Sequence, residues 1–179
     1  MNDQPNEPAN KSTEMMQIVA FTLSGEEYGL PISDVHEVIP LQKITPVPNS
    51  PESILGVINL RGKVIPVLDI DKEFHVNKEP TTVAQHIIIT ENEKGVLFGI
   101  QVDTVTEVLK VPSSAIKEAP KMVTNTIASD YIQGVIILES AAESGRMVLV
   151  LNIQSILVEQ MATHNGTIQE NKEVIAANP

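Results

Sequence analysis

The chain has 179 residues and a formal net charge of −11, with 12 Lys and Arg against 23 Asp and Glu, 42% hydrophobic residues and no Cys. The acidic charge disfavours binding to nucleic-acid backbones or anionic lipid, and the absence of Cys excludes disulfides and zinc–thiolate sites. Because aromatic residues make up only 3%, the core must consist of Val, Ile and Leu, which favours strands over helices.

The two ends of the chain are polar and differ from the segment between them. Residues 1–14 are expected to form a disordered arm and residues 162–179 a disordered tail, because both contain few apolar residues. The sequence contains no apolar run typical of a signal peptide or a membrane span. A cytoplasmic location is therefore expected.

Short apolar runs and turn signals alternate through the first half of the middle segment. Glycine-containing turns at 24–26 and 61–63 each separate two such runs, which predicts two hairpins. Between the hairpins, a third strand ends at Pro40, because proline cannot donate a ladder hydrogen bond. The predicted strands of this half are 17–23, 27–32, 34–39, 56–60 and 64–70.

The second half of the middle segment repeats the first. The matched pairs are 28–39 with 98–109, 54–60 with 132–138, and 67–70 with 150–153. Three matches in one order indicate a duplicated β subdomain. The repeat places further strands at 85–90, 96–102, 134–138 and 147–153, followed by a short C-terminal helix.

The strand pattern predicts a mainly β fold made of two small barrels of about five short strands each, with short helices. The first barrel is expected at about 15–80 and the second at about 81–161, with the possibility that strands exchange at the seam between them. Two related units can bury a face against each other, so this seam is also expected to form a binding groove.

No catalytic constellation is found in the sequence. The four histidines, His36, His75, His86 and His164, lack metal-ligand spacing. Phosphate-loop and nucleophile-elbow motifs are absent as well. A protein that is not an enzyme and needs no cofactor or metal is expected.

Two long motifs resemble a known family. The string Gly56-Val-Ile-Asn-Leu-Arg-Gly-Lys-Val-Ile-Pro-Val-Leu-Asp-Ile70 and the segment Glu26–Val38, EEYGLPISDVHEV, are similar to the CheW family, the coupling proteins of bacterial chemotaxis arrays. The resemblance extends from about Gln17 to Met161. It implies two tandem SH3-like five-stranded barrels and a non-catalytic adaptor. The implied partners are the regulatory domain of the histidine kinase CheA and the cytoplasmic tips of methyl-accepting chemoreceptors, at membrane-associated arrays.

The resemblance also implies partner-binding residues in the first closing hairpin. Arg61 matches the motif arginine and is expected to be a fixed cation that pairs with a partner carboxylate or with backbone carbonyls; the alternative is a solvated turn residue. Asn59 belongs to the same motif. Gly56 and Gly62 match motif glycines and are expected to affect binding only indirectly, through backbone geometry.

The third strand of the first copy carries the other implied contacts. Val35, Glu37 and Val38 match the family segment associated with partner and receptor contact, although the two valines could equally be core residues. Glu37 recurs as Glu107, so it could instead have one structural role in both copies. The helical receptor tip is expected to dock in the inter-barrel groove on aliphatic side chains. The expected lining is Ile32, Val35, Val38, Ile100 and Val102.

Two other functions remain open at this point. The first is the same adaptor in a parallel pathway that controls pili or gliding. The second is a small-ligand-sensing or hydrolytic double barrel, which would show acidic and histidine side chains converging at the seam.

Overall fold

A computed structural model describes residues 14–74, 85–120, 129–140 and 143–158. The expected arm and tail lie outside these residues, apart from residue 14. In chain order the elements are β1 (Met15–Leu23), β2 (Glu26–Pro31), the 3₁₀ turn η1 (Ile32–Asp34), β3 (Val35–Pro40), β4 (Ile54–Leu60), β5 (Lys63–Leu68), α1 (Ile70–Glu73), β6 (His86–Glu91), β7 (Leu97–Val102), β8 (Thr104–Pro112), η2 (Ser113–Ala115), β9 (Ile116–Lys117), η3 (Ser129–Tyr131), β10 (Ile132–Ser140) and β11 (Glu143–Leu151). Residues 153–158 are helical.

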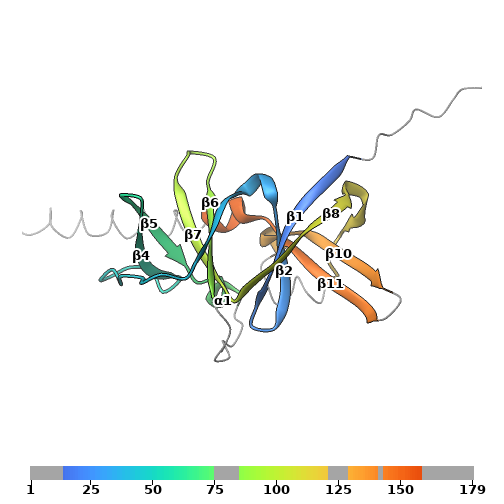
Figure 1. The fold of residues 1–179 in the computed structure, drawn as a ribbon, viewed down its shortest axis with the longest axis horizontal. Helices are drawn as coiled ribbons and strands as arrows, with labels where there is room; N and C mark the ends of the chain where they lie inside the picture. Colours follow the sequence, from blue (N-terminus) through green and yellow to red (C-terminus); the bar gives the residue numbers. More distant parts are fainter. Residues whose placement is uncertain (1–13, 75–84, 121–128, 141–142, 159–179) are drawn as a thin grey trace, which may run out of the picture.

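The strands form two sheets, so the predicted mainly β fold with two related β units is confirmed. Sheet A has the order β8-β1-β2-β11-β10-β9, and sheet B has the order β3-β6-β7-β5-β4. Figure 1 shows sheet B, mostly green, beside sheet A, which combines blue, olive and orange strands. The sixth strand of sheet A is the two-residue β9, which none of the predicted strands covers.

Each sheet contains strands from both sides of residue 80. The opening hairpin β1–β2 belongs to sheet A, where β1 pairs with β8 and β2 runs parallel to β11. The hairpin β6–β7 belongs to sheet B, where β6 pairs with β3 and β7 runs parallel to β5. Each sheet therefore combines the hairpin of one sequence copy with the later strands of the other.

The duplication extends to fine features of the strand pairing. The β3–β6 register skips His36, and the β8–β1 register skips Thr106, its counterpart 70 positions later. A β-bulge changes the direction in which neighbouring side chains point. Glu37 and Glu107 directly follow these two bulges, so the two copies present their glutamates from the same local geometry.

The centre of the seam between the sheets is filled by the largest hydrophobic core of the described residues. The core contains side chains of sheet A such as Phe21 and Leu30, side chains of sheet B such as Leu68 and Ile88, and Leu157 of the C-terminal helical residues. Smaller clusters pack on the other face of each sheet. The expectation of an open inter-barrel groove is thus wrong along the centre of the seam, because strands with apolar residues on both faces bury one face there.

The strand β6 has hydrophobic clusters on both of its faces. Ile87, Ile88 and Ile89 are fully buried in succession. Successive side chains point to opposite faces of the sheet. Ile88 therefore lies in the central core, whereas Ile87 and Ile89 lie in the smaller cluster on the other face of sheet B. β-Branched residues suit a strand that is covered on both faces. No helix among the described residues is long and apolar enough to cross a membrane.

Candidate functional site: the Arg61 end of sheet B

Arg61 lies at the tip of the β4–β5 hairpin. Leu60 and Lys63 pair across the hairpin, so Arg61 and Gly62 form a two-residue turn. Both have positive φ, 53° and 84° respectively, as in turns of type I′, whose twist matches that of the flanking strands. The Arg61 side chain is 76% exposed.

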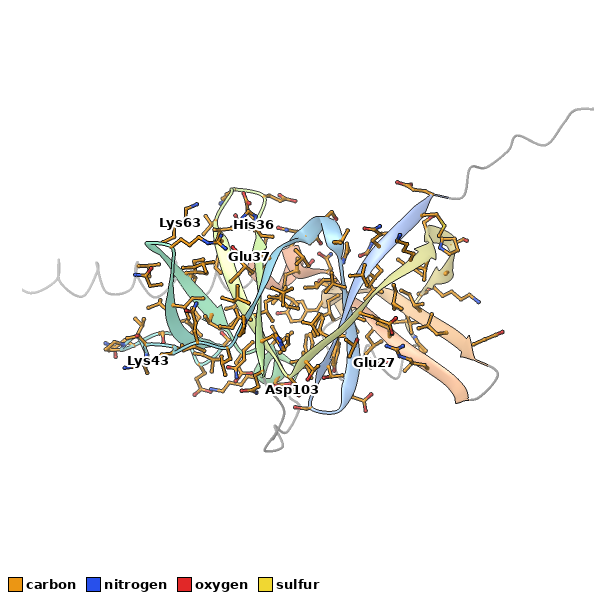
Figure 2. All side chains as sticks on the ribbon, in the orientation of Figure 1. Glu27, His36, Glu37, Lys43, Lys63 and Asp103 are labelled. Atoms are coloured by element: carbon orange, nitrogen blue, oxygen red, sulfur yellow. The ribbon has the colours of Figure 1, made fainter. Side chains whose placement is uncertain are left out.

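The Arg61 guanidinium is held by Glu37 despite this exposure. Nη1 donates to Oε1 of Glu37 at 3.0 Å, and Nη2 donates to Oε2 at 2.8 Å. This two-bond geometry fixes both the position and the plane of the guanidinium. Because Glu37 belongs to β3, the pair connects the two outer strands of sheet B, β3 and β4, through the hairpin tip. Figure 2 labels Glu37 and Lys63 toward the same end of this sheet.

The two valines beside Glu37 have different environments. Val35 is half-buried and packs against the central core, so it is at least partly a core residue. Val38 pairs with Ile88 at the edge of sheet B and remains 38% exposed. Val64, next to the Arg61 turn, is 70% exposed. Val38 and Val64 are thus exposed apolar side chains that lie near Glu37 and the Arg61 turn in the sequence.

Gly56 allows the chain to pass close to this hairpin. Its φ is +146°, and a Cβ atom on it would lie 2.2 Å from the Thr45 carbonyl oxygen. Thr45 and Val57 exchange two backbone hydrogen bonds of 2.8 Å at this point. A side chain on residue 56 would therefore break the contact that holds the outer edge of β4.

Asn59 contributes to the turn itself. Its Oδ1 accepts a hydrogen bond from the Gly62 backbone N–H at 2.9 Å. The residue is exposed, but this oxygen points to the backbone of its own hairpin.

The residues expected to line a receptor groove separate into two groups. Ile100 and Val102 are 0% and 1% exposed and belong to the central core, so their assignment to a surface groove is wrong. Both lie on β7, an inner strand of sheet B that has neighbours on both sides. Ile32 is 41% exposed on η1, and with Val35 and Val38 it is what remains of the expected lining.

A small surface pocket lies beside these remaining residues. It has a volume of about 180 Å³, and its lining includes Asp34, Val35, His36, Glu91 and Glu93. Nδ1 of His36 lies 3.9 Å from Oε2 of Glu91, and the two side chains are 52% and 46% exposed. The pair is thus a solvated surface contact, and no group of three or more metal-ligating side chains occurs in the described parts of the chain.

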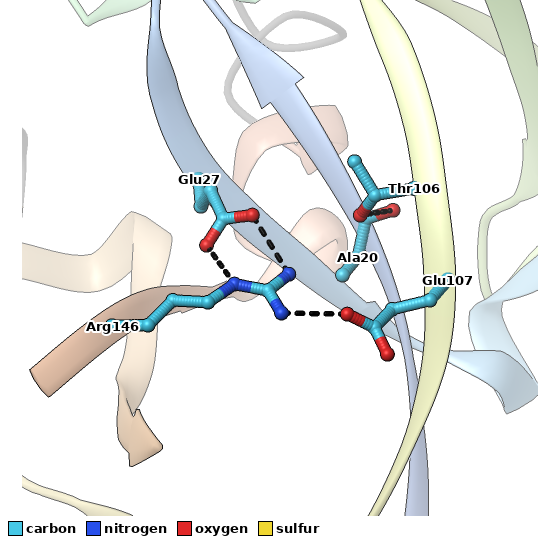
Figure 3. A network of polar contacts seen from close by, with 5 residues as sticks. All are labelled: Ala20, Glu27, Thr106, Glu107 and Arg146. Carbon is cyan, nitrogen blue, oxygen red and sulfur yellow. Dashed lines mark hydrogen bonds and ion pairs between the residues drawn. The ribbon is translucent and has the colours of Figure 1, made fainter. Parts of the chain in front are cut away.

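A second arginine site was missed by the sequence reasoning (Figure 3). Arg146 on β11 donates from Nε and Nη2 to Glu27 of β2, at 2.5 and 2.8 Å, and from Nη1 to Glu107 of β8 at 2.6 Å. Hydrogen bonds to these two carboxylates raise the pKa of Arg146 above its ordinary value. The repeat of Glu37 as Glu107 pointed to a matching glutamate in the second copy, but it did not indicate which residue would pair with it.

Comparison with known proteins identifies the family. A model of the CheW-like domain matches residues 17–161. The chain is 33% identical to the chemotaxis protein CheW of Klebsiella aerogenes over 150 residues, 82% of this chain and 84% of that one. It is 32% identical to CheW of Rhizobium meliloti over 144 residues, 78% and 86% of the two chains. The crystal structure of the scaffolding protein TtCheW from Thermoanaerobacter tengcongensis superposes with a TM-score of 0.69 at 35% identity, covering 82% of this chain and 90% of that one. Two-sheet architecture, sequence motifs and these matches agree that the chain belongs to the CheW-like family of non-catalytic chemotaxis scaffold proteins.

Proposed function

We propose that this protein couples the cytoplasmic tips of chemoreceptors to the regulatory domain of the histidine kinase CheA, and that the Arg61 end of sheet B is one docking surface. Its site of action would be the cytoplasm, at membrane-associated receptor arrays. Coupling here means holding two macromolecules together without covalent chemistry.

The observation that carries the proposal is an arginine that is both exposed and fixed. A free exposed arginine loses about 2 kcal/mol of side-chain entropy when it is immobilised. Arg61 is already held by Glu37 through two hydrogen bonds, so much of that cost is met before a partner arrives. A guanidinium has five N–H donors, and the donors not used for Glu37 suit a partner carboxylate or carbonyl.

Apolar residues near the pair provide the remainder of the surface. Val38 and Val64 are exposed on strands β3 and β5. Ile32, also exposed, would supply an aliphatic anchor for a receptor helix at the edge of the seam. Each contact can be weak, because many copies in one lattice raise the effective concentration of every partner.

The test compares Arg61→Ala with Lys63→Ala, which removes the same charge from the same hairpin. Calorimetric titration with the CheA regulatory domain, and separately with a receptor cytoplasmic fragment, should show at least one affinity reduced about tenfold or more by Arg61→Ala, because hydrogen bonds to charged groups contribute about 1.5–3 kcal/mol. Lys63→Ala should change affinity far less. Unchanged affinity for both partners, together with unchanged receptor-dependent kinase activity, would reject the role of Arg61.

A further inference from the structure

We propose that Asn59 is a positioning residue that acts on partners only through Arg61, by locking the turn on which Arg61 is displayed. The inference rests on the proposed function of Arg61 and adds to it. It replaces the expectation that Asn59 itself contacts a partner.

The lock is a single hydrogen bond across the hairpin tip. Oδ1 of Asn59 accepts the N–H of Gly62 at 2.9 Å, and these two residues flank Leu60 and Arg61 in the sequence. Asparagine side chains commonly mimic a backbone turn in this way, by accepting from an N–H a few residues further on. The bond therefore fixes the peptide between Arg61 and Gly62 relative to β4.

The turn needs such a lock because arginine is a poor residue for it. Type I′ turns require positive φ at both central positions and favour Asn, Asp or Gly there. Arg61 has φ 53°, which an L-residue with a long side chain adopts at a cost. Without the Asn59 bond, the turn would be expected to relax toward conformations in which Arg61 leaves the left-handed region.

The second copy shows that the asparagine is not a general requirement of the hairpin. In the β10–β11 pair, Ile137 opposite Met147 takes the place that Asn59 opposite Val64 has in β4–β5. Pairing there continues beyond Leu138 and Arg146 to Ser140 and Glu143, so that hairpin has no two-residue turn at this point. Asparagine thus occurs in the copy whose short turn displays an exposed arginine.

Arg61 is consequently held at two points. Asn59 fixes its backbone through Gly62, and Glu37 fixes its guanidinium through two hydrogen bonds. A binding group that is held in place at both ends loses little entropy on association. Removing either tether should weaken binding without removing any contact to the partner.

A double-mutant cycle tests the inference, with the CheA regulatory domain and a receptor cytoplasmic fragment as titrants. Asn59→Ala alone should weaken the Arg61-dependent interaction about fivefold, as expected for one lost hydrogen bond. In the Arg61→Ala background, Asn59→Ala should have no further effect. An equal additional loss in that background would show that Asn59 contacts the partner directly and would overturn the inference.

Two controls make the outcomes distinguishable. If Arg61→Ala itself leaves both affinities unchanged, the proposed function fails, and the role of Asn59 fails with it. If Arg61→Ala weakens binding but Asn59→Ala does not, only the inference fails. Hydrogen exchange of the Gly62 amide should accelerate in Asn59→Ala and stay slow in Asn59→Asp, which keeps an acceptor oxygen; equal exchange in the parent and in Asn59→Ala would also overturn the inference.

Discussion

Glu37 and Glu107 occupy equivalent positions in the two sheets, and each accepts hydrogen bonds from an arginine of the closing hairpin of its own sheet. The two arginines are not equivalent, however. Cross-strand pairing places Arg146 opposite Leu138, as it places Lys63 opposite Leu60, so Arg146 corresponds to Lys63 and not to Arg61. The same glutamate therefore serves an exposed turn in one copy and an interstrand contact in the other.

This difference predicts that two chemically identical changes lower the stability by different amounts. Arg146 is 30% exposed and connects β2, β8 and β11, so Arg146→Ala should lower the free energy of unfolding by about 2 kcal/mol. That corresponds to a melting temperature lower by about 4–8 °C. Arg61→Ala removes a pair whose arginine is 76% exposed and should change the free energy of unfolding by less than about 1 kcal/mol.

Thermal and chemical denaturation of both variants provide the measurement. Each variant removes one positive charge, so changes in net charge cancel between them. Equal losses of stability would contradict the structural assignment of Arg146, and a large loss in Arg61→Ala would mean that its pair with Glu37 is mainly structural.

The sequence contained the strands and the repeat, but not the way in which the strands are combined. Local alternation and turn residues located both hairpins because these depend on neighbouring residues. The strand β8 is the repeat counterpart of β3, and either strand could have paired with β1. The choice depends on contacts between residues about 90 positions apart, for example Val19 with Val108. The repeat makes both partners chemically similar, so pattern alone could not choose between them.

The candidate site was predictable to the same extent. Arg61 and Glu37 come from motifs, and the structure brings them together. Ile100 has the same aliphatic character whether it lies on a surface or in a core, so only the position of β7 within the sheet showed that it is buried. The contact of Arg146 with Glu27 spans 119 positions, and no sequence pattern links two such residues.

The two motif glycines should differ in their tolerance of a methyl group. Gly56→Ala places a Cβ 2.2 Å from the Thr45 oxygen at φ +146°, and overpacking together with strain should lower the free energy of unfolding by at least about 3 kcal/mol. At Gly62 a Cβ atom would have nothing within 4 Å, and only φ +84° opposes it. Gly62→Ala should therefore lower the free energy of unfolding by about 1 kcal/mol.

Urea denaturation of the two glycine variants checks this prediction. Binding should be measured only on folded protein, because Gly56 acts through the fold. A Gly56→Ala protein as stable as Gly62→Ala would show that the Thr45 segment moves away at little cost.

The combination of strands in each sheet predicts that neither half of the chain folds alone. Residues 1–80 would contain the hairpin β1–β2 without β8 and β11, its partners in sheet A. Residues 81–179 would contain β6–β7 without β3 and β5, its partners in sheet B. Each half would also expose its side of the central core.

Expression of the two halves as separate chains tests this prediction. Each alone should lack a cooperative thermal transition, whereas the two produced together should copurify and melt cooperatively. A dispersed amide NMR spectrum from either isolated half would contradict the prediction.

Tyr28 should limit stability at alkaline pH. Burial, followed by the negative charges of Glu26 and Asp71, raises the pKa of Tyr28 to about 12, against about 10 for an exposed tyrosine. The folded protein thus retains the phenol proton where the unfolded chain releases it. The corresponding stability is complete below about pH 10 and is lost between about pH 10 and pH 12, with a total of about 3 kcal/mol. Tyr28→Phe, which introduces the residue found at the repeat position 98, should remove this dependence.

Because lysines titrate in both proteins, the informative quantity is the difference between their unfolding free energies in urea from about pH 8 to pH 12. That difference should shift in favour of Tyr28→Phe as the pH rises, and parallel curves would show that the phenol is free to ionise in the folded state.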